Sequence, residues 1–291
     1  MQQANPNRNF PELIIESLIR AAGYSAILFV ALILFFLLRE GAPAFAEVKL
    51  DQLFAVSWYP VESLFGLLPL IGGSLIVTLG AALIAVPFGL ATAVFIAEIA
   101  PRWAREILKP LVEVLGGLPS VVLGFLGMLV LAPIVRITLN IPTGLTAFTG
   151  SLLLAGMAIP TLVSVAEDAL DAVPKSYRDA ALALGATKWQ TIWRVTVPAA
   201  RSGVLTAIML GVGRAIGETM TVMMVTGNAA VIPHTLLQPV RTLTATIAAE
   251  MGETVRGSDH YLALFAIGIV LFVISFAVNL IADLFLHRER I

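Results

Sequence analysis

Two opposite charges lie near the middle of one long apolar stretch, residues 203–227. Arg214 carries a planar fork of N–H donors that matches an oxyanion, and Glu218 follows four residues later. On a continuous helix this spacing places both side chains on one face. A charge at the centre of a bilayer costs roughly 2.5–3.5 kcal/mol, so that face must meet protein or water. The pair is either an ion pair that packs the helix or part of a path for an anion.

The anion-path hypothesis gives Glu218 a specific use. It would offset the charge of Arg214 while the path is empty. Its carboxylate would also accept a hydrogen bond from an oxyanion that is protonated at neutral pH, as phosphate is and sulfate is not. The hypothesis predicts that Glu218→Gln changes the transport rate or the preference for phosphate over sulfate.

The elements that must position these residues are membrane helices. Hydrophobic residues make up 58% of the 291-residue chain and charged residues 13%, outside the range of soluble domains. The apolar residues form six runs long enough to cross a bilayer as helices. We predict an all-α membrane protein with six transmembrane helices, at 18–38, 68–97, 111–135, 145–165, 203–227 and 262–285.

Composition also excludes several kinds of chemistry. The chain has no cysteine, its three histidines lie far apart, and we predict no metal site and no catalytic residue. With 18 basic and 19 acidic residues it has no basic excess for nucleic acid. It contains no GxxxxGK[ST] phosphate-binding loop, so any ATP that drives it must be hydrolysed by another chain.

Lysine and arginine residues predict the orientation. With the N-terminus inside, twelve of them fall on the inner side and five on the outer side, while Arg214 lies within a span. Both termini are therefore expected in the cytoplasm. We divide the chain into a tail, first helix and outer loop (1–66), a transmembrane domain (67–286) and a C-terminal cytoplasmic tail (287–291).

The inner loop, 167–200, has the pattern of a docking element. Ser176 with Asp179, and Thr187 with Gln190, have capping-box spacing, which predicts two short helices joined at Gly185. Pro198 is expected to close the second helix.

The first of these helices carries an apolar face. Tyr177, Ala180, Ala181 and Leu184 recur at spacings of three and four and suit a groove on a soluble partner. The alternative is an interfacial helix on lipid headgroups, which nearby basic residues would also permit.

The same loop carries a family resemblance. Asp179-Ala180-Ala181, three residues, Gly185, nine residues and then Val-x-Val-Pro198 resembles the EAA loop of ABC importer permeases. In that family the loop is the coupling helix that fits a cleft on the ATPase subunit. The resemblance assigns ATPase coupling to Tyr177, Asp179, Ala180, Ala181, Leu184, Gly185, Ala186 and Pro198.

Further stretches resemble permeases of the high-affinity phosphate importer, the Pst system, and its C-type subunit more than its A-type. They are residues 68–78, 116–125, 167–181 and 213–228. The resemblance implies a type-1 ABC importer permease fold in a bacterial inner membrane, and it carries phosphate transport onto Arg214 and Glu218. Within the predicted span 111–135, Pro119 removes a backbone hydrogen bond, and a freed carbonyl must face protein or a wet cavity. We therefore also place Pro119 and Ser120 on the path.

The resemblance also implies the partners. They are a second, homologous permease in a heterodimer, two ATP-binding subunits that hold ATP-Mg, a periplasmic phosphate-binding protein, inorganic phosphate and the lipid bilayer. The chain itself would bind no cofactor. Two rivals remain: a permease for sulfate or molybdate, and a stand-alone secondary anion transporter, which would have no use for a docking element.

Overall fold

The structure is a computed structural model that describes residues 10–47 and 50–288. Helices dominate these residues, and the two short strands form one small hairpin that pairs Trp58 with Phe65 and Tyr59 with Leu64. The all-α expectation is confirmed. The predicted C-terminal tail begins inside the last helix, and its residues 289–291 lie outside the described residues.

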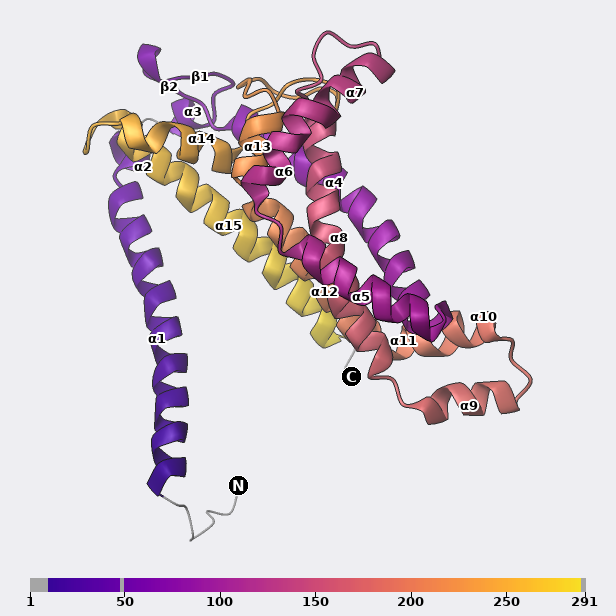
Figure 1. Ribbon diagram of the computed structural model, residues 1–291. Helices are drawn as coiled ribbons and strands as arrows, with labels where there is room; N and C mark the ends of the chain where they lie inside the picture. The colour runs from indigo at the N-terminus through magenta and orange to yellow at the C-terminus, as the bar shows by residue number, and fades with distance from the viewer. Residues whose placement is uncertain (1–9, 48–49, 289–291) are drawn as a thin grey trace.

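Within 10–47 and 50–288 the elements follow one another as 22 short or long segments, labelled in Figure 1 where there is room. Their bounds are α1 (Phe10–Gly41), α2 (Ala44–Glu47), α3 (Leu50–Leu53), β1 (Trp58–Tyr59), η1 (Pro60–Glu62), β2 (Leu64–Phe65), α4 (Leu68–Val94), η2 (Phe95–Ile99), α5 (Arg102–Gly116), α6 (Ser120–Leu126), η3 (Gly127–Leu131), α7 (Ala132–Thr138), α8 (Ala147–Asp171), α9 (Lys175–Ala183), α10 (Lys188–Thr191), η4 (Ile192–Thr196), α11 (Val197–Ala199), α12 (Arg201–Gly217), α13 (Met220–Val225), α14 (Leu243–Glu250), η5 (Met251–Glu253) and α15 (Asp259–Arg288).

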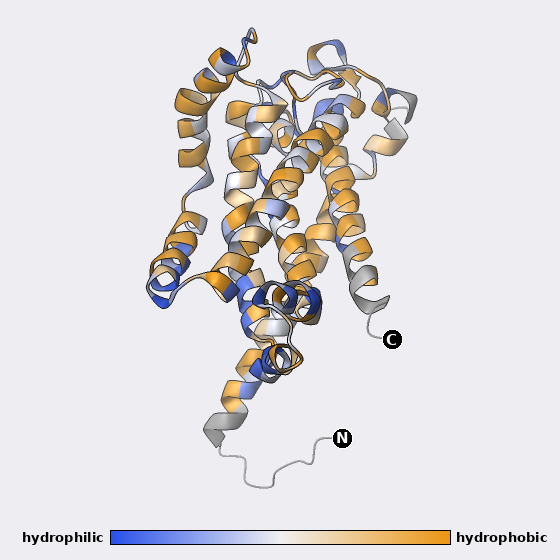
Figure 2. Ribbon diagram, turned by 90° about the vertical axis from the view of Figure 1, so that its right-hand side faces the viewer, coloured by the Kyte–Doolittle hydropathy of each residue, from blue (hydrophilic) through white to orange (hydrophobic). Residues whose placement is uncertain are grey.

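Five helical segments of the described chain are long and apolar enough to cross a membrane. They contain α1, α4 with η2, α6 to α7, α8, and α15. A sixth candidate is bent by 73°, between Lys188–Ala199 and Arg201–Gly217. Counting this bent pair as one span gives six, the predicted number, although only Arg201–Gly217 overlaps the predicted span at 203–227. Figure 2 shows hydrophobic residues along the helices and hydrophilic residues gathered toward the two ends.

The predicted span at 111–135 is not one helix. α5 ends at Gly116 and α6 begins at Ser120, so the apolar span is Ser120–Thr138 and α5 is a separate, charged helix. Two glycines followed closely by Pro119 explain the break. Proline has no N–H for a helical bond and disfavours helical backbone at the residue before it.

The predicted span at 203–227 is also interrupted. α12 ends at Gly217, Glu218 has extended backbone (ψ 132°), and α13 begins at Met220. Glycine is a weak helix former, so the helix can end there at low cost.

α8 lies at the centre of the bundle, with α4 and α12 packed along it. Gly80 on α4 allows close approach, since a methyl group there would meet the Ser151 hydroxyl at 2.4 Å. Ser151 in turn donates to the Val77 carbonyl of α4 at 3.1 Å. Small residues at such a crossing let two membrane helices pack closely. α8 is therefore the element against which both helix breaks are positioned.

The two ends of the bundle differ in character (Figure 1). The first turn of α1, the end of α15 and the projecting helix α9 lie toward one end, and the hairpin, α14 and the end of α7 lie toward the other. The start of α1 and the end of α15 therefore lie at the same end of the bundle as α9.

Candidate functional site

The two helix breaks face each other. The Thr221 hydroxyl of α13 donates to the carbonyl of Ser120, the first residue of α6, at 3.0 Å. Close packing supports this contact, because a methyl group on Gly124 of α6 would lie 3.1 Å from the Thr221 Cα. The break at 117–119 and the break at 218–219 therefore form one region, against α8.

Arg214 lies half-buried at this region and joins three helices. Its Nη1 donates to the Thr161 hydroxyl of α8 at 2.9 Å, and its Nη2 donates to the Gly116 carbonyl at the end of α5 at 3.2 Å. Both acceptors are neutral. Among the described residues, no carboxylate forms an ion pair with Arg214, so its positive charge lacks a protein counter-ion there.

The predicted arrangement of Glu218 is wrong. Its carboxylate accepts the Thr221 backbone N–H at 3.2 Å, and its carbonyl accepts the Thr244 hydroxyl of α14 at 2.8 Å. Because the helix ends one residue earlier, Glu218 does not share a helical face with Arg214 and does not pair with it. It instead satisfies an N–H in the first turn of α13.

The other two predicted path residues lie at the same place. Pro119 is exposed and has extended backbone directly before α6, and the half-buried Ser120 presents its carbonyl to Thr221. Sequence reasoning missed the threonines Thr161, Thr221 and Thr244. A hydroxyl within an apolar stretch was the available signal, because a buried hydroxyl needs a hydrogen-bond partner.

The docking element has the predicted hinge. Gly185 has a φ of +83°, the Ala186 N–H bonds the Ala181 carbonyl at 3.1 Å, and the Gly185 N–H bonds the Leu182 carbonyl at 2.9 Å. This is a Schellman ending of α9, and it needs the left-handed backbone that glycine tolerates. The capping box of Thr187 and Gln190 is also confirmed.

Two local predictions for this element are wrong. Ser176 does not cap α9, because the extended Pro174 precedes the helix and Lys175 is already helical. Pro198 does not close the second helix but lies within α11, which ends one residue later at Ala199. Helical backbone is continuous from η4 into α11, so Pro198 lies in the last turn of the segment, which ends one residue after it.

The predicted apolar face is divided. Leu184 is 90% exposed and Tyr177 54% exposed, and Asp179 and Ala180 are also exposed, whereas Ala181 is buried. Ala181 is buried because α9 packs against η4 along that side. The exposed part of the face is left for a partner.

Arg178 fastens α9 to the bundle. Its guanidinium donates twice to Glu98 of η2, at 3.0 and 2.6 Å, and also to the carbonyls of Leu170 at 2.8 Å and Val173 at 2.6 Å. These contacts occupy Arg178 within the protein, so it is not a free cation for lipid headgroups.

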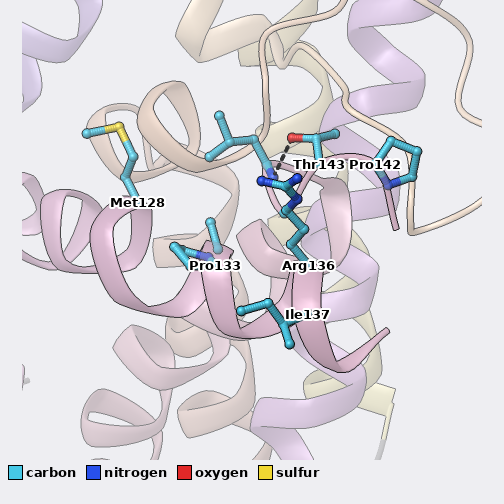
Figure 3. A pocket seen from close by; sticks show the side chains of 9 residues that line it. Met128, Pro133, Arg136, Ile137, Pro142 and Thr143 are labelled. Atoms are coloured by element: carbon cyan, nitrogen blue, oxygen red, sulfur yellow. Dashed lines mark hydrogen bonds between the residues drawn. The ribbon is translucent and has the colours of Figure 1, made fainter. Parts of the chain in front are cut away.

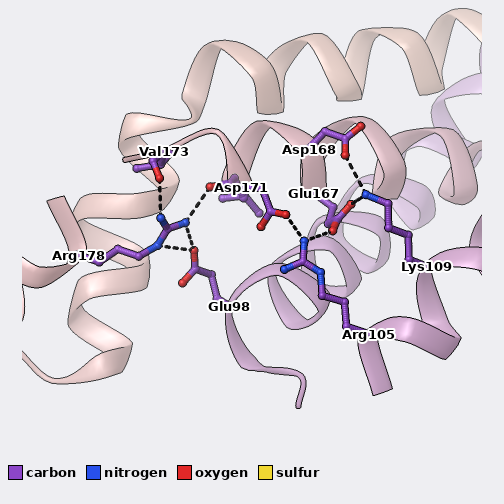
Figure 4. Close-up of polar contacts among 9 residues, drawn as sticks. Glu98, Arg105, Lys109, Glu167, Asp168, Asp171, Val173 and Arg178 are labelled. Carbon is purple, nitrogen blue, oxygen red and sulfur yellow. Dashed lines mark hydrogen bonds and ion pairs between the residues drawn. The ribbon is translucent and has the colours of Figure 1, made fainter. Parts of the chain in front are cut away.

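An ion-pair ladder joins α5 to α8 beside this anchor (Figure 4). Arg105 pairs with Glu167 at 2.5 Å and with Asp171, and Lys109 pairs with Glu167 at 2.6 Å and Asp168 at 3.0 Å. We call these five residues the α5–α8 ladder.

The ladder shifts the titration of its cations, which lie on α5 outside the apolar spans. The hydrogen bond to Asp171, with a further contribution from Glu167, raises the pKa of Arg105 against the effect of burial. The hydrogen bonds to Glu167 and then Asp168 raise the pKa of Lys109 in the same way. A protonated partner makes the stronger charge-assisted bond.

A cavity of about 250 Å³ lies at the other end of the bundle, between α7 and the loop that follows it (Figure 3). Arg136 points into it among Pro133, Ile137, Pro142 and Thr143. The sequence did not predict this cavity, because it forms only where the loop at 142–145 folds back onto η3 and α7. Within the described residues, no group of three histidine or acidic side chains is placed to hold a metal.

Comparison with known proteins finds a matching protein family. Residues 85–291 match the family described as "Binding-protein-dependent transport system inner membrane component". The Bacillus subtilis (strain 168) "Probable ABC transporter permease protein YqgH" is 40% identical over 244 residues, which cover 83% of this chain and 79% of that protein. The "Phosphate transport system permease protein PstC" of Xylella fastidiosa (strain 9a5c) is 35% identical over 254 residues, covering 81% and 78%. PstC of Pasteurella multocida (strain Pm70) is 31% identical over 301 residues, covering 97% and 93%.

Two solved structures share the fold. A chain of a bacterial alginate ABC transporter, in complex with an alginate pentasaccharide-bound periplasmic protein, matches with a TM-score of 0.66 at 16% identity. That match covers 97% of this chain and 98% of the other. A chain of the MetNI methionine ABC transporter, in inward-facing conformations, matches with a TM-score of 0.59 at 18% identity, covering 74% and 92%. The expected ABC importer permease fold is confirmed.

Proposed function

Because the chain belongs to the family of binding-protein-dependent transport system inner membrane components, we propose that it moves inorganic phosphate across the inner membrane as the permease subunit of an ATP-driven importer. It is a multi-pass transport subunit rather than an enzyme. Phosphate as the cargo rests on the PstC relatives, which are named for phosphate transport.

One observation in the structure carries the proposal. Arg214 sits where two helix breaks meet, and it is held by a hydroxyl and a carbonyl instead of a carboxylate. Interrupted helices that line a site near the middle of the membrane are typical of transport paths. An arginine that forms no ion pair within the protein attracts an anion, and its unused N–H donors suit phosphate oxygens.

Glu218 would act beside Arg214 as an acceptor. Its carboxylate has one backbone bond, to Thr221, and carboxylate oxygens can accept more than one hydrogen bond. A protonated phosphate oxygen would donate to it, whereas sulfate has no such proton to give. Pro119 and Ser120 would border the same path, because the Ser120 carbonyl bonds Thr221.

The partners follow from the exposed surfaces. α9, with its exposed Tyr177 and Leu184, would dock on an ATP-binding subunit that hydrolyses ATP-Mg. Two such subunits, a periplasmic phosphate-binding protein and a second homologous permease would complete the importer. Gly213 and Gly217 support the second permease, because both are exposed on α12 and a methyl group added at either would meet nothing within 4 Å. Small residues at this spacing favour close helix contact.

The orientation is part of the proposal. α9, the start of α1 and the end of α15 share one end of the bundle, which would be cytoplasmic because ATP is hydrolysed there. The hairpin and α14 would then face the binding protein.

Purification of the complex through this chain tests the proposal. The complex is reconstituted in liposomes, and ATP hydrolysis is compared with phosphate-loaded and sulfate-loaded binding protein. Stimulation by phosphate alone is expected. Stimulation by sulfate would favour the sulfate permease, and absence of any co-purifying ATPase would favour a stand-alone secondary transporter.

A further inference from the structure

The two groups that hold Arg214 come from the two helices that the α5–α8 ladder joins. Gly116 ends α5 and Thr161 lies in α8, and each accepts one bond from the Arg214 guanidinium. Gly116 also lies against α8, since a methyl group there would be 3.4 Å from the Pro160 Cβ. The position of Arg214 therefore depends on how α5 and α8 lie relative to each other.

Glu167, at the centre of the ladder, fixes the position of α5 relative to α8. The Glu167 side chain is 1% exposed, its Oε1 accepts from Arg105 at 2.5 Å, and its Oε2 accepts from Lys109 at 2.6 Å. Arg105 and Lys109 are one helical turn apart, as are Glu167 and Asp171. Matched pairs one turn apart define a single register of the two helices, and a buried carboxylate is stable only while its cations stay in place.

The ladder lies close enough to Arg214 to act on it. Lys109 is seven residues from Gly116, and Glu167 is six residues from Thr161. At about 1.5 Å per residue, each helix spans about 10 Å between ladder and site. Over such a short packed length, sliding or tilting at the ladder changes the separation of the two Arg214 acceptors.

The docking element joins the same helix at the ladder. Arg178 of α9 bonds the Leu170 carbonyl, which is adjacent to Asp171 of the ladder, and the Val173 carbonyl just beyond α8. A force on α9 therefore reaches the inner end of α8 directly. α5 receives it through the side chains of the ladder and, at its first turn only, through η2, whose Glu98 also bonds Arg178.

We infer that Glu167 is a positioning residue that makes α5 and α8 move as one unit when the docking element is displaced. The Gly116 carbonyl and the Thr161 hydroxyl then move together and both continue to accept hydrogen bonds from Arg214. The inference rests on the proposed function and adds to it the connection between ATPase movement and the anion site. Without Glu167, α8 still moves with α9 but α5 lags, so ATP is hydrolysed with less phosphate transported.

The reconstituted complex tests this with Glu167→Gln, which keeps the size of the side chain and removes its charge. The matched control is Glu106→Gln, which makes the same change at an exposed residue of α5 outside the ladder. Phosphate uptake and ATP hydrolysis are measured together in each variant. Phosphate moved per ATP should fall about tenfold in Glu167→Gln, the effect of roughly 1.4 kcal/mol on the balance of two states. ATPase stimulation by loaded binding protein should persist.

A second variant tests the same inference if the Glu167→Gln complex does not assemble. Lys109→Gln removes one cation of the ladder from a partly exposed position, and its phosphate per ATP should also fall. Unchanged phosphate per ATP in an assembled Glu167→Gln or Lys109→Gln complex overturns the inference while the proposed function stands. If wild type and Glu106→Gln show no phosphate-dependent stimulation, it is the proposed function that fails.

Discussion

The Arg214 guanidinium donates a 2.9 Å hydrogen bond to the hydroxyl of Thr161, a residue 53 positions earlier on the central helix α8. The bond crosses between two spans and orients the one charge of α12 that faces the helix breaks. It also leaves the arginine without an ion-pair partner among the described residues, so its charge is not held by a protein carboxylate.

Removal of the Thr161 hydroxyl should impair phosphate uptake. Thr161→Val keeps the shape of the side chain and deletes the acceptor, and a hydrogen bond to a charged group contributes roughly 1.5–3 kcal/mol. We expect uptake at limiting phosphate to fall about tenfold, with Thr161→Ser close to wild type. Thr206→Val is the control, because that hydroxyl bonds only the Ser202 carbonyl of its own helix. Wild-type uptake in Thr161→Val would show that Thr161 does not orient Arg214.

Loss of the Arg178 anchor should destabilise the docking element. Arg178→Ala removes four hydrogen bonds and leaves Glu98, which is 9% exposed, without its cation. Breaking a largely buried pair costs roughly 3 kcal/mol or more. Less ATPase should therefore co-purify with this variant and the complex should melt at a lower temperature. Lys175→Ala, on the exposed part of α9, should change neither, and equal behaviour of the two variants would contradict the anchor.

The Gly185 hinge should not tolerate a side chain. Its φ of +83° costs an L-residue roughly 1–2 kcal/mol, so Gly185→Ala should distort the turn that follows α9. We expect weaker ATPase stimulation in Gly185→Ala and a milder defect in Gly185→Asn, since asparagine tolerates this backbone better. Gly252→Ala, at an exposed glycine without close neighbours, is the control. A fully stimulated Gly185→Ala complex would contradict the role of the hinge.

The ladder should make stability fall at alkaline pH. Its carboxylates raise the pKa of Lys109 above the ordinary value of 10.5, so the folded state binds the proton more tightly than the unfolded chain. The stabilisation is complete below the unfolded pKa and is lost as pH rises through the folded one. As pH rises above about 10.5, wild type should lose more thermal stability than Lys109→Met, which lacks this proton, and below that pH the difference between the two should stay constant. Parallel losses in the two proteins would show that the ladder does not contribute in this way.

The sequence predicted what depends on local pattern. Apolar runs located the membrane helices, and the spacing around Gly185 predicted the turn of the docking element and the Thr187 cap. It could not predict that α12 stops at Gly217, because a broken helix and a continuous one have the same apolar composition. The same-face arrangement of Arg214 and Glu218 failed for that reason.

Contacts between distant segments were beyond such reasoning. Glu167 meets Arg105 and Lys109 from 62 and 58 residues away, and Thr161 meets Arg214 from 53. The periodicity of a helix indicates which of its faces is buried, but it does not indicate which residue of another helix lies against that face. Ala181 was assigned to an exposed face because nothing in the helix itself indicates that η4 covers it.

Uptake of radiolabelled phosphate into proteoliposomes that contain the complete importer tests the central claim most directly. Wild type, Arg214→Ala and Arg256→Ala are compared, the last removing an exposed arginine from the outer loop. Arg214→Ala should abolish phosphate uptake in an assembled complex, and Arg256→Ala should transport like wild type. Phosphate uptake at the wild-type rate in Arg214→Ala would contradict the claim that the arginine between the two helix breaks handles the anion.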